Sequence, residues 1–237
     1  MKPPPLLAAV GLLWLVFTAC RAPATTPPRP LPLDLGHYWV YENLSQGLGD
    51  RRAFTTTEAV CRLRPNPPDT LYMVATCSET DLVQTSVLAT RRAALYQPLV
   101  ITRDGQPRPR QPPEPLLPLD LQVGLAWEWQ GTLGQPPEPR HHRYIVANWG
   151  RVLVPAGEFE AWRVLVSELT EPTLLAHVER WYAPGIGLVR ERSLILGQRE
   201  GQPFRFALSR ALREYGRRPV QDLSCCQRLA ARLGEGD

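Results

Sequence analysis

The sequence predicts a mostly β protein, in which an antiparallel meander forms a curved sheet or half-barrel and a short C-terminal helix follows. From His37 onward, short runs rich in β-branched and aromatic residues recur about every ten residues, with turn residues between them. After Pro219, apolar residues fall three and four positions apart, which is typical of one helix face. With 43% hydrophobic and 21% charged residues among 237, the composition excludes a disordered or collagen-like chain.

Residues 1–19 have the features of a lipoprotein signal peptide. Lys2 supplies the positive end, and Leu6 to Phe17 is an uncharged, mostly apolar run, far shorter than the about 20 residues that a spanning helix needs. The run ends in Phe17-Thr18-Ala19-Cys20, which resembles the lipobox of bacterial lipoproteins, with Phe17 where leucine is commonest. We expect Cys20 to be lipidated and to anchor the protein, because acyl chains add membrane affinity. A short membrane-anchor helix is the alternative.

A tether is expected behind the anchor, with the folded part outside the cytoplasm, in the bacterial cell envelope. The tether covers residues 20–34 and includes a proline-rich stretch from Ala22 to Leu33, which favours an extended, semi-rigid chain. Arg21 stands where an aspartate would mark inner-membrane retention in enteric-like sorting, a rule that does not transfer to every envelope. The inner and the outer membrane are both open as the anchoring site.

Residues 35–215 are expected to form one antiparallel β domain. Between Leu125 and Leu133, apolar residues alternate with polar ones, which predicts a strand with one buried face. Turns are predicted at 148–150, 155–157 and 184–187, where glycine or proline suits a reversal. The other strand-like runs are 37–44, 51–63, 71–79, 82–90, 93–102, 144–148, 151–154, 158–169, 174–183, 188–196 and 204–208.

Two segments depart from this pattern. Residues 106–118 hold six prolines in thirteen positions, so we predict a linker or long loop, because proline lacks the donor that a central strand needs. Residues 216–237 are expected to be a helical tail that covers part of the sheet or an open edge, with a partner-binding helix as the alternative. Its apolar stripe consists of Val220, Leu223, Cys226, Ala230 and Leu233.

Three segments carry a family resemblance: Gly36 to Tyr41, Val152 to Val164 with its Val-Pro-Ala-Gly turn, and Trp181 to Arg190 with Ala-Pro-Gly-Ile-Gly. They resemble the signature segments of the TapB-like family of uncharacterised exported bacterial proteins and lipoproteins. The resemblance implies a curved antiparallel sheet, similar to the half-barrels of lipoprotein carriers, with no established activity and no catalytic residues. Residues 106–118 and the cysteine-bearing tail lie outside it.

Four cysteines remain beside Cys20, and disulfides persist in an exported domain. Three connectivities are open. We favour Cys61 with Cys77, which would close a loop of about 15 residues and add about 3 kcal/mol, although a simple hairpin would not set the two opposite each other. The competing arrangement ties Cys226 to a strand cysteine, with Cys225 facing away because neighbours on a helix point about 100° apart. A metal site is not expected, since no CxxC is present.

Enzymatic chemistry and cofactors are not expected. The sequence has no GxSxG elbow, HExxH helix, P-loop or GxGxxG turn, and Lys2 is its only lysine. His141 and His142 follow a proline-containing loop and are expected to be ordinary loop neighbours. A position of either histidine in a cleft beside a carboxylate would favour the alternative hypothesis of a hydrolase with an unfamiliar site.

The leading functional hypothesis is a membrane-anchored, non-enzymatic envelope lipoprotein that binds an apolar ligand in its concave sheet. Trp127 and Trp129 share one strand face and are the candidate ligand-binding residues. A protein interaction module of the envelope is the alternative, and the hydrolase comes third. A net charge of +4 is too small to indicate nucleic acid as a partner.

Overall fold

The computed structural model describes residues 30–47, 50–91, 93–169, 175–199 and 202–234. The predicted signal peptide, Cys20 and the tether up to residue 29 lie outside the described residues. No helix in the described part is long and apolar enough to cross a membrane.

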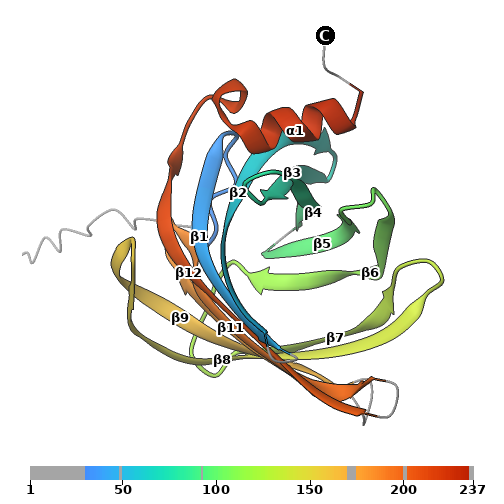
Figure 1. The fold of residues 1–237 in the computed structure, drawn as a ribbon, viewed down its shortest axis with the longest axis vertical. Helices are drawn as coiled ribbons and strands as arrows, with labels where there is room; N and C mark the ends of the chain where they lie inside the picture. The colour runs from blue at the N-terminus through green and yellow to red at the C-terminus, as the bar shows by residue number, and fades with distance from the viewer. Residues whose placement is uncertain (1–29, 48–49, 92, 170–174, 200–201, 235–237) are drawn as a thin grey trace, which may run out of the picture.

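The described residues form twelve antiparallel strands that follow one another around a closed barrel (Figure 1). The mostly β meander is confirmed, but the open half-barrel is wrong, because the last strand pairs with the first along its length. The strands are β1 (His37–Gly47), β2 (Asp50–Asn66), β3 (Asp69–Cys77), β4 (Leu82–Arg91), β5 (Ala94–Ile101), β6 (Pro107–Pro118), β7 (Ala126–Leu133), β8 (Glu138–Val154), β9 (Gly157–Glu168), β10 (Leu175–Ala183), β11 (Gly187–Arg199) and β12 (Gln202–Arg217).

The proline-rich segment is the second departure from expectation, because residues 107–118 form β6 and not a loop. This strand pairs with β5, but it meets β7 at only two register positions, Arg110 with Leu133 and Gln111 with Thr132. Prolines are tolerated where a strand edge needs few donors, and β6 has such an edge toward β7. Side-chain hydrogen bonds from β7 to β6 carbonyl groups add to these two backbone pairs.

The turns expected at 155–157 and 184–187 are present, whereas residues 148–150 continue β8. The register between β8 and β9 shifts between Val146 and Asn148, which marks a bulge. Such a bulge bends the strand without reversing it, and it accounts for the turn-like composition of this stretch.

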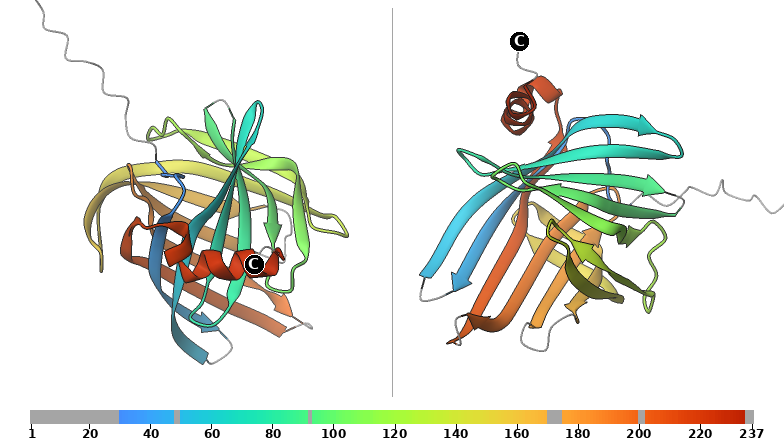
Figure 2. Two further views of the ribbon diagram at one scale, coloured as in Figure 1. Left: turned by 90° about the horizontal axis from the view of Figure 1, so that it is seen from above. Right: turned by 90° about the vertical axis from the view of Figure 1, so that its right-hand side faces the viewer.

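The C-terminal tail forms a short 3₁₀ turn, η1 (Val220–Asp222), and the helix α1 (Ser224–Arg232), which lies across the outside of the barrel (Figures 1 and 2). Its apolar side covers β2 and β3 through a second hydrophobic core outside the barrel. This core includes Tyr38, Ala59, Ala75, Leu82, Leu223 and Leu229. The tail therefore covers the sheet as predicted, but its buried face differs from the predicted stripe, because Cys225 and Leu229 are buried and Leu233 is exposed.

Two disulfides join α1 to the barrel, Cys61 to Cys226 and Cys77 to Cys225. The favoured Cys61–Cys77 pairing is wrong. Cys77 lies opposite Thr57, four residues from Cys61, so the two cysteines are about 13 Å apart along the strands. The expectation that Cys225 faces away is also wrong, since both helix cysteines are buried against the sheet. Side chains about 100° apart can lie on either side of one contact line.

Candidate functional site

The two ends of the barrel differ in how they are filled. At one end, Leu31 and Leu33 pack into the barrel interior beside Trp39 and the β10–β11 turn, and we call this the tether end. Gly187 in that turn has a φ of +103°, and a Cβ there would lie 2.6 Å from Leu31 Cδ1. The opposite end, which we call the mouth, includes the neighbouring β1–β2 and β11–β12 hairpins (Figure 2).

Most of the interior at the tether end is a packed apolar core. Trp39, Tyr41 and Val189 are nearly fully buried there, and the indole N–H of Trp39 donates to the Ile186 carbonyl at 2.6 Å. The enclosed cavity among these side chains has a volume of about 140 Å³. This cavity at the tether end is well below the 300–1,000 Å³ typical of small-molecule sites.

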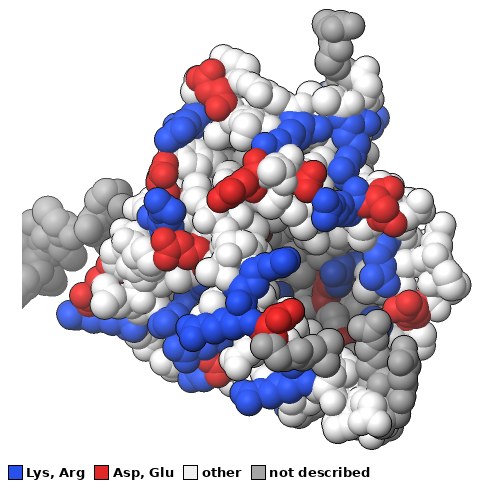
Figure 3. Space-filling view, viewed as in Figure 1, with Lys and Arg blue, Asp and Glu red and all other residues white. Residues whose placement is uncertain are grey.

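Ionisable side chains line the lumen between this core and the mouth. They occupy inward positions of the strands, since Arg180 and Glu191 alternate with side chains on the outer wall. Figure 3 shows the molecule hollowed on the viewed face, with basic and acidic side chains in the recess. We call this set the lumen charge cluster: Glu58, Arg110, Glu114, His142, Glu168, Arg180, Glu191 and Arg210.

Glu114 is the most buried member, with an exposed fraction of 1%. Its carboxylate accepts hydrogen bonds from Arg110 and the Tyr144 hydroxyl, and it lies 2.5 Å from Nδ1 of His142. Nε2 of His142 lies 2.7 Å from Oε2 of Glu168. Burial of a carboxylate is costly unless it is paired and hydrogen-bonded, and Glu114 meets both conditions.

Burial lowers the pKa of the His142 imidazole, and Arg110 and Arg180 act in the same direction, while Glu168 opposes them. Burial also raises the pKa of Tyr144 to about 12. A neutral imidazole donates from one ring nitrogen only, yet His142 has a carboxyl group at each nitrogen. A neutral His142 thus needs one further proton on a carboxyl group to satisfy both contacts.

Two further ion pairs complete the cluster. Arg180 donates to Glu191 at 2.8 Å, and Arg210 donates to Glu58 at 2.7 Å with its guanidinium 4.1 Å from the Tyr41 ring centre. Burial raises the pKa of the Glu191 carboxyl, but Arg180 and Arg210 outweigh it and hold the pKa below its usual value. The cluster is therefore charged, paired and buried, which favours a rigid polar interior beneath the mouth.

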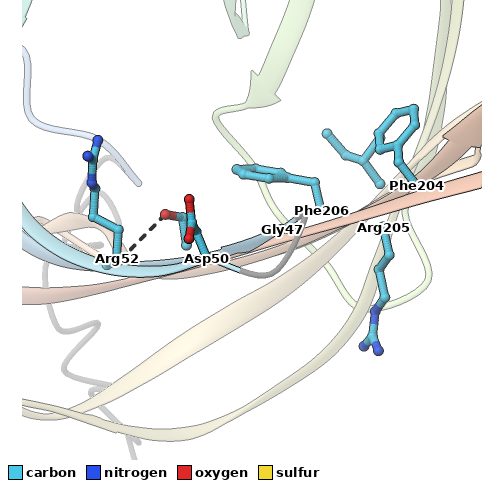
Figure 4. Close-up of a pocket in the computed structure, with 8 residues that line it drawn as sticks. Gly47, Asp50, Arg52, Phe204, Arg205 and Phe206 are labelled. Atoms are coloured by element: carbon cyan, nitrogen blue, oxygen red, sulfur yellow. Dashed lines mark hydrogen bonds between the residues drawn. The ribbon is translucent and has the colours of Figure 1, made fainter. Parts of the chain in front are cut away.

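The mouth holds a pocket of about 560 Å³ on the inner face of the two hairpins (Figure 4). Phe204, Phe206 and Arg52 point to the same side in this view, and Arg205 points away. Ser45 holds the β1–β2 hairpin in register by donating to the Arg52 carbonyl at 3.4 Å. The lining is Ser45, Gly47, Asp50, Arg52, Ile195, Phe204, Arg205 and Phe206. Its volume and aromatic lining are typical of a site for a small apolar or amphiphilic molecule.

Trp127 and Trp129 share the inner face of β7, as expected, but neither lines the mouth pocket or the enclosed cavity. The Trp127 indole donates to the Pro115 carbonyl and the Trp129 indole to the Pro112 carbonyl, each at 2.9 Å. Trp127 also stacks on Tyr144 with ring centres 5.0 Å apart. The two rings therefore fasten β6 to β7, and a ligand-binding role for them stays a prediction.

The two neighbouring histidines lie on β8, not on a loop. Nε2 of His141 lies 3.0 Å from Glu128 on the outer wall, while His142 lies inside the lumen. Both are beside carboxylates, but neither lines the pockets described above. Within the described ranges, no group of three or more His, Cys, Asp and Glu side chains has the arrangement of a metal site.

Comparison with known proteins found no matching family model and no matching curated protein. Among solved structures, a "putative lipoprotein" of Parabacteroides distasonis covers 81% of this chain and all of its own, with 10% identity and a TM-score of 0.46. A "putative exported protein with YmcC-like fold" of Bacteroides fragilis has the same coverage, 11% identity and a TM-score of 0.42. At these TM-scores the likeness adds no argument to those made from the residues.

Proposed function

We propose that the chain is a membrane-anchored, non-enzymatic lipoprotein of the bacterial cell envelope that binds an apolar ligand at the mouth of its barrel. Membership of the TapB-like group, which three sequence segments resemble, is part of this proposal. The observation that carries the binding role is the pocket of about 560 Å³ with Phe204, Phe206 and Ile195 in its lining. This pocket is open to the outside, whereas the interior at the tether end is a packed apolar core.

The envelope location is supported by the two disulfides, because such bonds persist in oxidising compartments. Anchoring is supported by the Phe17-Thr18-Ala19-Cys20 segment at the end of a short apolar run. Cys20→Ser should leave the signal peptide uncleaved and move the protein from the membrane to the soluble fraction, as fractionation and intact-mass measurement would show. Normal processing with unchanged membrane retention would contradict the lipobox interpretation.

Ligand binding is tested with native mass spectrometry of protein extracted gently from its own cells, followed by titration with a fluorescent fatty acid. A co-purifying lipid is the expected result. Phe204→Ser/Phe206→Ser should weaken fatty-acid binding at least tenfold, because about 1.5–3 kcal/mol accompanies full burial of each large apolar side chain. Leu153→Ser is the matched control, since Leu153 is 73% exposed on β8 and lines no part of the pocket. Equal affinities in both variants would refute the mouth as the binding site.

The interaction-module alternative is favoured by a groove of about 510 Å³ on the outer face of β3 to β6. Leu71, Tyr96, Leu99 and Pro113 contribute to its apolar lining. The Asp69–Arg91 ion pair, at 2.7 Å, lies at the same groove. Recovery of a stoichiometric protein, without lipid, in the same mass spectrometry experiment would favour this alternative.

A further inference from the structure

Three arginines surround one tryptophan on the outer wall of β9 to β11. The guanidinium carbons of Arg163, Arg190 and Arg192 lie 5.7, 5.8 and 5.8 Å from the ring centre of Trp181. Trp181 pairs with Arg190 on one side and with Arg163 on the other. We call these four residues the Trp181 cluster.

Strand alternation places the cluster outside the barrel. Trp181 lies between Arg180 and Tyr182, both of which point into the lumen, and Arg190 and Arg192 flank the inward Glu191. Successive side chains of a strand point to opposite faces, so the same short segments build the buried lumen cluster and this external one. The external group is therefore a separate feature from the mouth and its charged floor.

The Trp181 cluster carries more positive charge than its surroundings neutralise. Among the described residues, Glu179 is the one carboxylate with an ion pair to these three arginines, bonding Arg163 at 2.5 Å. Nε of Arg163 and Nε of Arg190 are buried, yet neither has a hydrogen-bond acceptor in the described part of the chain. Two unsatisfied donors and about two unneutralised charges at one ring make this surface suited to an anion.

The charges of the arginines in the Trp181 cluster also favour anion binding. Burial lowers the pKa of the Arg190 guanidinium, and the nearby Arg192 charge lowers it further. The arginines repel one another, and a bound anion would relieve that repulsion. Arginine is suited to this role, because its planar fork matches a phosphate or carboxylate.

The position of the cluster identifies the source of the anion. Arg190 is three residues, about 10 Å, from Gly187, the glycine against which Leu31 packs at the tether end. From Pro30 back to Cys20 there are ten residues, which span at most about 35 Å when extended. A membrane that holds a lipid on Cys20 is thus within reach of this wall.

We propose that the Trp181 cluster binds the phosphate groups of anionic phospholipids at the surface of the anchoring membrane. Tryptophan favours the interface between headgroups and acyl chains, and basic side chains near the surface add attraction to anionic lipids. The argument from position rests on the proposed anchoring at Cys20, whereas the argument from charge does not. The test therefore uses protein without the lipid.

The experiment measures co-sedimentation of the chain from Arg21 to Asp237 with vesicles of phosphatidylethanolamine and phosphatidylglycerol. This chain lacks the apolar signal run and Cys20 but keeps every described residue. Vesicles in which phosphatidylcholine replaces phosphatidylglycerol supply the uncharged baseline. The test variant adds Arg163→Gln/Arg190→Gln/Arg192→Gln. The matched control adds Arg51→Gln/Arg103→Gln/Arg143→Gln, which removes the same charge from exposed side chains that belong neither to the Trp181 cluster nor to the lining of the mouth pocket.

The test variant should bind anionic vesicles on the order of 100-fold more weakly, at about fivefold for each arginine, and the control should retain most of the binding. Arg190→Gln and Arg192→Gln alone should each show the fivefold step, which keeps the test valid if the triple variant unfolds. Equal losses in test and control variants, or no preference for anionic vesicles, would overturn the proposal. Saturable binding of inorganic phosphate without vesicle binding would overturn it too, by assigning the cluster to a free anion.

Discussion

Removal of both disulfides should cost more stability than the sum of the two separate losses. The bonds Cys61–Cys226 and Cys77–Cys225 each span most of the chain, with sequence separations of 165 and 148. They lie next to each other, however, because Cys225 and Cys226 are neighbours. While one bond holds, the other closes a ring of only about 17 residues, made of the chain from 61 to 77 and the single step from 225 to 226.

The magnitudes follow from these ring sizes. The chain-entropy relation gives about 3 kcal/mol for a ring of about 17 residues and about 5 kcal/mol for a loop of about 150. Cys77→Ala/Cys225→Ala and Cys61→Ala/Cys226→Ala should therefore each lower the free energy of unfolding by about 3 kcal/mol. The variant with all four alanines should lose about 8 kcal/mol, because its chain has no long cross-link at all.

Urea unfolding of the full chain, followed by tryptophan fluorescence, measures these losses. Reduced parent protein is the control, since it lacks both cross-links but keeps the four buried sulfur atoms in their hydrophobic core. A four-alanine variant that loses only the sum of the two pairs, about 6 kcal/mol, would refute the shared-ring reasoning. A loss of about 5 kcal/mol in either pair variant would refute it as well.

Two further predictions concern the lumen wall. Acidification from about pH 7.5 to 5.5 should destabilise the protein, because histidine in the unfolded chain takes up a proton near pH 6.5, while the lowered pKa of His142 keeps the folded form neutral. His142→Gln should flatten this part of the pH profile of the urea midpoint. Identical profiles for the variant and the parent protein would contradict this expectation. Trp129→Phe removes the indole donor to the Pro112 carbonyl, so it should lower the free energy of unfolding by about 1–2 kcal/mol and speed amide exchange in β6. Trp149→Phe is the control and should leave amide exchange in β6 unchanged.

Features of the fold that depend on neighbouring residues could be predicted from the sequence, whereas features that depend on pairing between distant strands could not. The alternation from Leu125 to Leu133 and the turns at 155–157 and 184–187 depend on neighbours in the chain, and these local patterns predict the structure correctly. Closure depends on β12 meeting β1 across the whole chain, from Arg217 opposite His37 onward, and no local pattern records that meeting. The strand β6 is hard to predict for a related reason, since its proline-rich edge meets β7 at only two register positions and is joined to it by tryptophan side chains, which lie outside the local sequence.

The candidate site was predictable only in part. The alternation of Phe204 and Phe206 is visible in the sequence and places both on one face, but nothing local shows that this face lines an open mouth. The lumen charge cluster was missed because a charged residue in a strand is normally taken to face water. A usable signal was present, since Arg180 and Glu191 fall in the inward positions that buried side chains such as Tyr182 also occupy.

The weak contact between β6 and β7 has a mechanical consequence for the whole molecule. Cutting the barrel there leaves two six-stranded sheets, β1–β6 and β7–β12, which remain joined at the fully paired boundary between β1 and β12. On that boundary's side, α1 from the second sheet is covalently attached to β2 and β3 of the first. The boundary between β1 and β12 is thus reinforced by two disulfides nearby, whereas the seam between β6 and β7 has two register pairs and two tryptophan hydrogen bonds. We expect this seam to separate first when the barrel unfolds.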